Sequence, residues 1–243
     1  GWQLAIVKKI NKFDTLIKTI NDLDGAIDYE SISWTKKEFD ELFKVGDVIY
    51  VKKIKDNKYE LKQLPKVNGG IVVMDPFTGR VYAISGGFSF KKSEFNRATQ
   101  AFRQPGSAFK PFVYLTALEK GYPPNLKILD APLVINQGAD LGKWNPANYT
   151  RKFYGLSTMR LGLEKSRNLM TVRLAQMIGI DSVVNQAQKL GISNNLPHVL
   201  SMALGAGETT LLRLTTAYAM LVNGGKKIKP ILQMENISKS YGQ

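Results

Sequence analysis

The first 66 residues place apolar and polar side chains in alternation over short runs, and clusters of Asp, Asn and Gly separate these runs. Alternation with a period of two is typical of β-strands that bury one face. The separating clusters, such as 21–25 and 56–57, carry side chains that favour tight turns. The pattern predicts short strands at residues 4–10, 15–20, 26–31, 47–54 and 58–64. Five such strands in so short a segment suit a small all-β barrel.

From residue 67 onward the pattern changes to a hairpin followed by helices. A buried-type apolar run at 71–74, turn residues at 75–79 and a returning run at 80–85 predict the hairpin. Apolar positions at helical spacing predict helices at residues 112–118, 156–165, 169–178, 181–190 and 209–222. Because the pattern changes at this point, we expect two domains, residues 1–66 and residues 67–243.

Glycine and proline mark two further segments of the second domain. Residues 123–154 are rich in Pro, Asn and Gly, so we expect an irregular segment there, of the kind that is either functional or mobile. The stretch 203–209 contains Gly205 and Gly207 just before the last expected helix. We interpret these glycines as positions of close backbone packing.

The charge of the chain is unevenly distributed between the two expected domains. The net formal charge is +14; residues 1–65 hold 12 basic and 11 acidic side chains, whereas residues 66–243 hold 22 and 9. A barrel that binds single-stranded nucleic acid needs a basic groove with stacking aromatics, so the nearly neutral first domain argues against a nucleic-acid partner. We expect its aromatic side chains to fill the core instead: Trp2, Phe13, Tyr29, Trp34, Phe39 and Phe43. The positive charge of the second domain fits either solubility or attraction to anionic lipid head groups and wall polymers.

The absence of Cys and the single His, His198, limit the nucleophilic chemistry open to the chain. Ser-His-Asp and Cys-His centres are nearly excluded, and a His-Glu-x-x-His zinc site is impossible. If the protein has a nucleophilic hydroxyl, Lys is the base that remains available.

Ser107 and Lys110 lie at the start of the helix expected at 112–118. Residues three apart share a helix face, so their side chains can meet. A helix N-terminus favours a nearby oxyanion, and burial can lower the pKa of Lys until it accepts a hydroxyl proton. The same spacing begins at Ser33 and Ser89, where no long apolar helix follows and we expect solvated loops. Taken alone, an N-cap with a surface Lys explains the Ser107 motif about equally well.

A second polar motif, Ser166-x-Asn168, lies between two segments of helical periodicity. Ser193-x-Asn195 has the same form. We favour Ser166, because the helix that follows it at once would fix the geometry of its side chains.

Together, Ser107-x-x-Lys110 and Ser166-x-Asn168 resemble the motifs of the penicilloyl serine transferase superfamily. Longer blocks at 95–107, 144–149 and 75–79 resemble the transpeptidase domain of class A penicillin-binding proteins of the 1A type. Blocks at 45–48 and 61–65 are similar to the OB-like insert of that family. The resemblance implies a multi-domain fold in which an OB-like barrel precedes an α/β transpeptidase domain of serine β-lactamase-like type.

The resemblance implies a peptidoglycan D,D-transpeptidase that forms a serine acyl-enzyme on D-Ala-D-Ala stem peptides. Ser107 would be the nucleophile, Lys110 its general base, Ser166 the proton donor to the leaving amine, and Asn168 the residue that holds the stem-peptide amide and orients Lys110. It implies no metal or cofactor. The implied partners are stem peptides, β-lactam antibiotics and other cell-wall synthesis proteins. The implied location is the outer face of the bacterial cytoplasmic membrane, with an anchor outside this chain.

The third motif of the family, Lys-Thr-Gly or Lys-Ser-Gly, does not occur in the sequence. The nearest string, at residues 239–242, has the wrong order. We therefore expect a chain that ends before this motif, which leaves the activity of these 243 residues alone open. A serine β-lactamase is the alternative enzyme, disfavoured by the β-rich first domain. A non-catalytic wall-binding or docking module is the alternative of another class.

Overall fold

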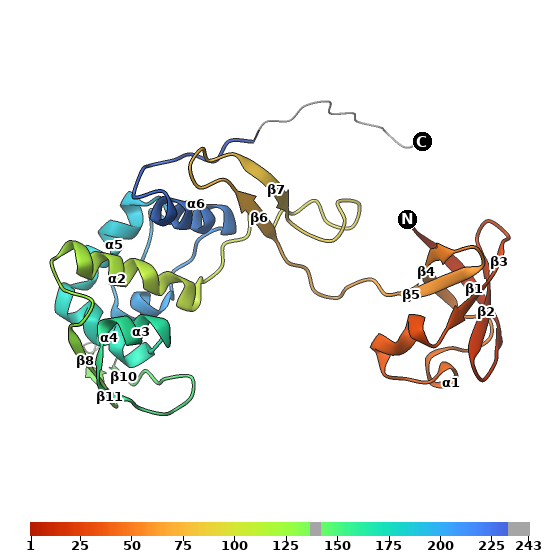
Figure 1. Ribbon diagram of the computed structural model, residues 1–243, viewed down its shortest axis with the longest axis horizontal. Coiled ribbons are helices and arrows are strands. Elements are labelled where there is room, and N and C mark those ends of the chain that lie inside the picture. Colours follow the sequence, from red (N-terminus) through yellow and green to blue (C-terminus); the bar gives the residue numbers. More distant parts are fainter. Residues whose placement is uncertain (137–141, 233–243) are drawn as a thin grey trace. The chain divides into compact units, whose positions relative to one another are not determined.

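The structure is a computed structural model, and it describes residues 1–136 and 142–232. The chain divides into two compact units, Gly1–Val67 and Asn68–Gln243, which can be followed in Figure 1. No helix in the two described ranges is both long enough and apolar enough to cross a membrane.

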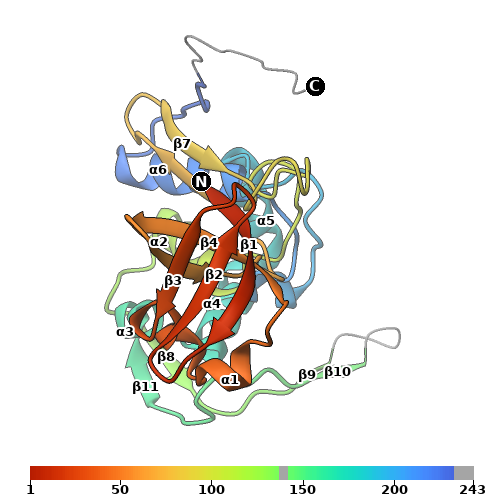
Figure 2. The ribbon, with the colours of Figure 1, turned by 90° about the vertical axis from the view of Figure 1, so that its right-hand side faces the viewer.

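The first unit is a closed barrel with the strand order β1-β2-β3-β5-β4, as the alternating pattern predicts. Figure 2 shows the strands of this barrel from their outer side. Neighbouring strands pair antiparallel, except that β3 meets β5 in parallel where Ala26 lies opposite Lys58. A 3-10 helix, Glu30–Thr35, and the single-turn α1, Phe39–Leu42, follow β3. Both are too short to show a helical period. The strands are β1 (Trp2–Ile10), β2 (Asp14–Thr19), β3 (Asp24–Asp28), β4 (Val48–Lys55) and β5 (Lys58–Lys62).

The barrel core contains fewer aromatic side chains than expected. Phe39 and Phe43 are buried, but Phe13, Tyr29 and Trp34 are about half exposed or more, so the prediction is wrong for these three. The reason is their position. Phe13 lies in a turn, Tyr29 directly precedes the 3-10 helix and Trp34 lies within it, so none of the three alternates along a strand. Aliphatic strand residues fill the interior together with Tyr59: Ala5, Val7, Ile17, Ile27, Val51 and Leu61.

The second unit begins with the expected hairpin of β6 (Ile71–Met74) and β7 (Val81–Ser85). The helix α6, Leu211–Val222, packs on β6. The run 71–74 is not buried on both faces, because Ile71 and Val73 remain exposed while the alternate residues are half-buried. In the described residues, α6 covers one face of this two-stranded sheet, so the run is half-buried on that face and exposed on the other.

Within the described ranges, four α-helices follow the hairpin before α6: α2 (Lys110–Glu119), α3 (Met159–Glu164), α4 (Asn168–Ile178) and α5 (Ile180–Lys189). The helix expected at 156–165 is shorter than predicted. Its first residues form β11 (Gly155–Thr158), which pairs antiparallel with β8 (Lys127–Asp130). The expected irregular segment therefore contains regular pieces, β8 and the two-residue strands β9 (Ile135–Asn136) and β10 (Lys143–Trp144).

The core of the second unit forms around α2 and α4. Phe109, Phe112 and Val113 of the α2 region are fully buried, as are Met170 and Leu174 of α4. Because α2 is surrounded by other elements, the polar side chain at its first position, Lys110, is drawn into the interior.

Candidate active site

Ser107 lies in a 3-10 turn, Gly106–Phe109, that runs directly into α2. Pro111 occupies the first turn of α2, where a missing backbone donor is tolerated. Ser107 is exposed, whereas Lys110 is only 1% exposed. The expected placement at a helix N-terminus is therefore confirmed, but the two side chains differ sharply in burial.

The chain before and after Ser107 is held by a segment about a hundred residues away. Arg103 and Thr209 exchange two backbone hydrogen bonds of 2.9 and 3.1 Å. The hydroxyl of Tyr218 on α6 donates to the carbonyl of Ala108 over 2.7 Å. These contacts hold the Ser107 turn in place both before and after Ser107.

Gly205 lies against the backbone of the same turn. Its carbonyl accepts a hydrogen bond of 3.3 Å from the N–H of Gly106, and its φ is +76°. A Cβ at Gly205 would lie 2.2 Å from the carbonyl oxygen of Gly106 and 2.6 Å from its nitrogen. No side chain fits there, so the prediction of close backbone packing by glycine is confirmed for this position.

The amine of Lys110 lies among acceptors from the second motif. Lys110 Nζ is 2.6 Å from the carbonyl oxygen of Ser166, 2.9 Å from Ser166 Oγ and 2.6 Å from Asn168 Oδ1. An ammonium has three hydrogens, which match these three acceptors of the described chain. Among the described residues, no hydrogen bond joins Lys110 Nζ to Ser107 Oγ. The structure therefore brings three of the four predicted residues into contact and places Ser107 one turn away.

Burial, with a smaller contribution from the positive charge of Arg167, lowers the pKa of Lys110 to about 8. At pH 7 about a tenth of such a group is neutral. The neutral amine donates two hydrogen bonds and keeps a lone pair that can accept a proton from a nearby hydroxyl. The base that the sequence analysis assigns to Lys110 is thus chemically accessible near neutral pH.

Ser166 has a backbone conformation that is unusual for its residue type. Its φ is +50°, and the backbone bonds Ser166 N to Leu163 O (3.0 Å) and Arg167 N to Gly162 O (2.8 Å) close the end of α3. These two bonds form a Schellman motif, in which glycine is the usual left-handed residue. A serine here turns both its carbonyl and its hydroxyl toward Lys110.

Asn168 is the first residue of α4, and its amide makes contacts at both ends. Its Oδ1 accepts from Lys110, while its Nδ2 donates to the carbonyl of Ala147 over 2.7 Å. The side chain therefore joins the buried amine to the irregular segment.

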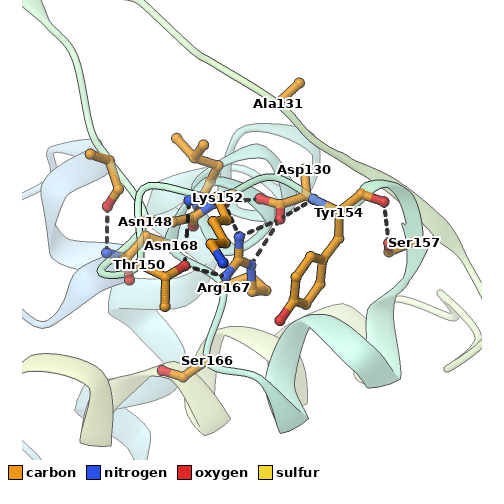
Figure 3. A network of polar contacts seen from close by, with 12 residues as sticks. Asp130, Ala131, Asn148, Thr150, Lys152, Tyr154, Ser157, Ser166, Arg167 and Asn168 are labelled. Carbon is orange, nitrogen blue, oxygen red and sulfur yellow. Dashed lines mark hydrogen bonds and ion pairs between the residues drawn. The ribbon is translucent and has the colours of Figure 1, made fainter.

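Arg167, between Ser166 and Asn168, forms a buried ion pair with Asp130, which the sequence patterns did not predict. Arg167 and Asp130 are 3% and 0% exposed, and Figure 3 shows Arg167 pointing into a polar network while Ser166 points away from it. Asn148 also belongs to this network. A signal was present in the sequence, because Asp130 is a lone acid after the apolar pair Ile128-Leu129.

The other copies of the motifs lie elsewhere. Ser193 is buried in a loop, where its hydroxyl accepts from the N–H of Asn195 over 3.4 Å. Ser33 lies in the 3-10 helix of the barrel, not in a loop, and Ser89 lies in a loop after β7. The string at 239–242 lies outside the described residues.

Family models and relatives agree on the class of the chain. A model described as penicillin binding protein transpeptidase domain matches residues 69–241, and one described as penicillin-binding protein OB-like domain matches residues 1–67. Penicillin-binding protein 1A of Rickettsia conorii is 47% identical over 232 residues, which cover 94% of this chain and 29% of that protein. The chain thus spans about three tenths of the length of this curated relative.

Solved structures show the same fold. Penicillin-binding protein 1A from Haemophilus influenzae superposes with a TM-score of 0.86 at 32% identity, over 95% of this chain and 34% of that one. The PonA1 protein from Mycobacterium tuberculosis in complex with penicillin V superposes with a TM-score of 0.59 at 26% identity, over 66% and 45%. This chain therefore belongs to the penicillin-binding protein transpeptidase family, in its 1A branch, and carries an OB-like domain before its transpeptidase domain.

Proposed function

We propose that this chain carries the serine acyl-transfer centre of a peptidoglycan D,D-transpeptidase that β-lactams inhibit. The observation that supports it best is the buried Lys110 amine, which contacts Ser166 and Asn168 one turn from the exposed Ser107 hydroxyl. The family supplies the substrate class, stem peptides that end in D-Ala-D-Ala. The proposed location is the outer face of the cytoplasmic membrane, where these peptides are cross-linked.

The proposed first step transfers an acyl group from the stem peptide to Ser107. Ser107 Oγ attacks the carbonyl of the penultimate D-Ala, and its proton passes to the neutral amine of Lys110. The Ser107 N–H contributes to the oxyanion site. The C–N bond to the terminal D-Ala then breaks, and the departing amine takes a proton that Ser166 relays from Lys110. The contact of 2.9 Å between Lys110 Nζ and Ser166 Oγ supports this relay.

The second step releases the acyl group from Ser107. The amine of a neighbouring stem peptide attacks the ester carbonyl and loses a proton to the same relay. The bond from this carbonyl to Ser107 Oγ then breaks, Ser107 regains its proton from Lys110, and the cross-link is formed. A β-lactam would acylate Ser107 by the same attack, with opening of its ring, and would leave an ester that hydrolyses slowly. Asn168 is proposed to orient Lys110 and to bind the amide of the stem peptide.

Labelling with fluorescent penicillin tests this proposal in the full-length product of the gene. We expect a stable label that Ser107→Ala abolishes. Ser89→Ala is the matched control, because it removes the serine of another Ser-x-x-Lys copy and should leave labelling intact. Rapid loss of the label would favour a β-lactamase instead. Labelling that survives in Ser107→Ala, or no label on the unaltered protein, would contradict the proposal.

A further inference from the structure

We propose that Arg167 and Asp130 are positioning residues for this acyl transfer: their buried ion pair holds the turn that presents Ser166 and Asn168 to Lys110. The inference rests on the proposed function of the site. Arg167 stands between Ser166 and Asn168 in the chain, but Figure 3 shows its side chain pointing toward Asp130 while the side chain of Ser166 points elsewhere. It therefore acts on the site through the backbone that it anchors.

The ion pair has the geometry of a rigid anchor. Arg167 Nε and Nη2 both lie 2.8 Å from Asp130 Oδ2. The guanidinium also donates to Thr150 Oγ1 over 3.3 Å and to the carbonyl of Lys152, and it stacks 4.1 Å from the ring centre of Tyr154. All three nitrogens are thus engaged, and the planar group is held on several sides.

Asp130 connects this anchor to the irregular segment beside the site. Its Oδ1 accepts from Asn148 Nδ2 over 2.8 Å, and its Oδ2 accepts from the N–H of Tyr154 over 3.0 Å. Asn148 Oδ1 in turn accepts from the N–H of Leu169 in the first turn of α4, over 3.3 Å. The start of α4 and the segment 147–154 are therefore tied to the same carboxylate and amide.

The anchor acts at the position where the backbone is strained. Arg167 follows Ser166, whose φ of +50° is unfavourable for a residue with a Cβ and persists only where the surroundings impose it. In a Schellman motif the residue at the position of Arg167 is usually apolar and packs against the helix end. Here the ion pair with Asp130 replaces that contact. If the anchor is released, Ser166 can leave the left-handed conformation and withdraw both of its acceptors from Lys110.

The charges around Lys110 provide a second readout. Arg167, directly before α4, is the positive group that lowers the pKa of Lys110, and Asp130 on β8 is its counter-ion. Tyr114 on α2 and Tyr218 on α6 are phenols with raised pKa values and stay neutral in this range. Removing the Arg167 charge should therefore raise the pKa of Lys110.

The test compares two substitutions of Arg167 in the full-length product of the gene, by the rate of acylation with fluorescent penicillin as a function of pH. Arg167→Lys keeps the charge but loses the planar fork, so we expect a 10- to 100-fold slower reaction with an unchanged pH midpoint. Arg167→Gln should be at least as slow and should also shift the midpoint to higher pH. Asp130→Asn should slow acylation similarly.

Arg173→Gln is the matched control. Arg173 lies on α4, which begins directly after Arg167, and donates to carbonyls of the same region, Leu129 O (2.9 Å) and Ala131 O (2.8 Å). Among the described residues, no hydrogen bond or ion pair joins it to Asp130. We expect an acylation rate within about threefold of the unaltered protein and the same pH midpoint. Equal losses in Arg173→Gln and Arg167→Gln, or normal rates in both Arg167 variants, would overturn the inference.

A spectroscopic measurement separates failure of this inference from failure of the proposed function. NMR titration of Lys110 in the unaltered protein and in Arg167→Gln reports its pKa without any acylation. If Ser107 is never labelled, the proposed function fails, yet a higher Lys110 pKa in Arg167→Gln, together with loss of the contact with Ser166 in its crystal structure, would still support the positioning role. An unchanged pKa and an intact contact would refute it.

Discussion

The close contact between Gly205 and Gly106 allows a sharp test of how the Ser107 turn is held. In Gly205→Ala the new Cβ would lie 2.2 Å from a backbone oxygen, which cannot rotate away as a side chain could. The φ of +76° adds a cost of about 1–2 kcal/mol for any residue with a Cβ. Overpacking adds about 1–3 kcal/mol. We therefore expect a loss of about 2–5 kcal/mol in the free energy of unfolding of the second unit.

Gly191→Ala separates these two contributions. Gly191 has nearly the same φ, +74°, but a Cβ added there would meet no other atom within 4 Å, so only the conformational cost of about 1–2 kcal/mol applies. Urea unfolding followed by far-UV circular dichroism measures both variants, since the longer helices lie in the second unit. The difference between the two variants is the cost of the clash.

The same pair of variants tests the link to chemistry. A shift of about 1 Å in the Ser107 turn should slow acylation by fluorescent penicillin up to about 100-fold in Gly205→Ala. Gly191→Ala should react at the normal rate. If the two variants unfold at the same urea concentration and react equally fast, Gly205 does not hold the turn and the reasoning fails.

Two further outcomes follow from the contacts of Lys110. Because the pKa of Lys110 is about 8, the acylation rate should rise with pH and level off above about pH 8. Lys110→Met should abolish the reaction. A rate that does not change between about pH 6 and 9 would contradict the assignment of Lys110 as the general base. Ser166→Gly should be more stable than Ser166→Ala by about 1 kcal/mol, because glycine tolerates the φ of +50°. Both variants should lose acylation, and equal unfolding midpoints would argue against backbone strain at Ser166.

Local patterns predict most of the elements, and the two motifs contain the residues that the structure brings together, Lys110 with Ser166 and Asn168. The barrel strands, the hairpin and the helix after Ser107 follow from alternation, turn residues and helical spacing. The apolar spacing of residues 156–158 fits either a helix or a strand, and pairing with β8 decides in favour of a strand. The burial of 71–74 also depends on which face a helix covers, which no single strand encodes.

The parts of the site that the sequence could not predict depend on contacts between distant segments. The ion pair of Arg167 with Asp130 joins residues 37 positions apart, and Gly205 meets the Ser107 turn from about a hundred positions away. Motif spacing carries no information on such contacts. Motif spacing does predict that Ser166 and Asn168 lie close together, because both stand at the start of a helix that fixes their geometry.

The burial of Lys110 lowers the stability of the folded protein. A pKa lowered from 10.5 to about 8 corresponds to about 3 kcal/mol, present in full below pH 8, where the folded and unfolded chains both carry the proton. Between pH 8 and 10.5 the unfolded chain binds more protons, so raising the pH recovers this amount. Selection for stability alone would replace this lysine. Under the proposed function, its presence is a trade-off between stability and reactivity.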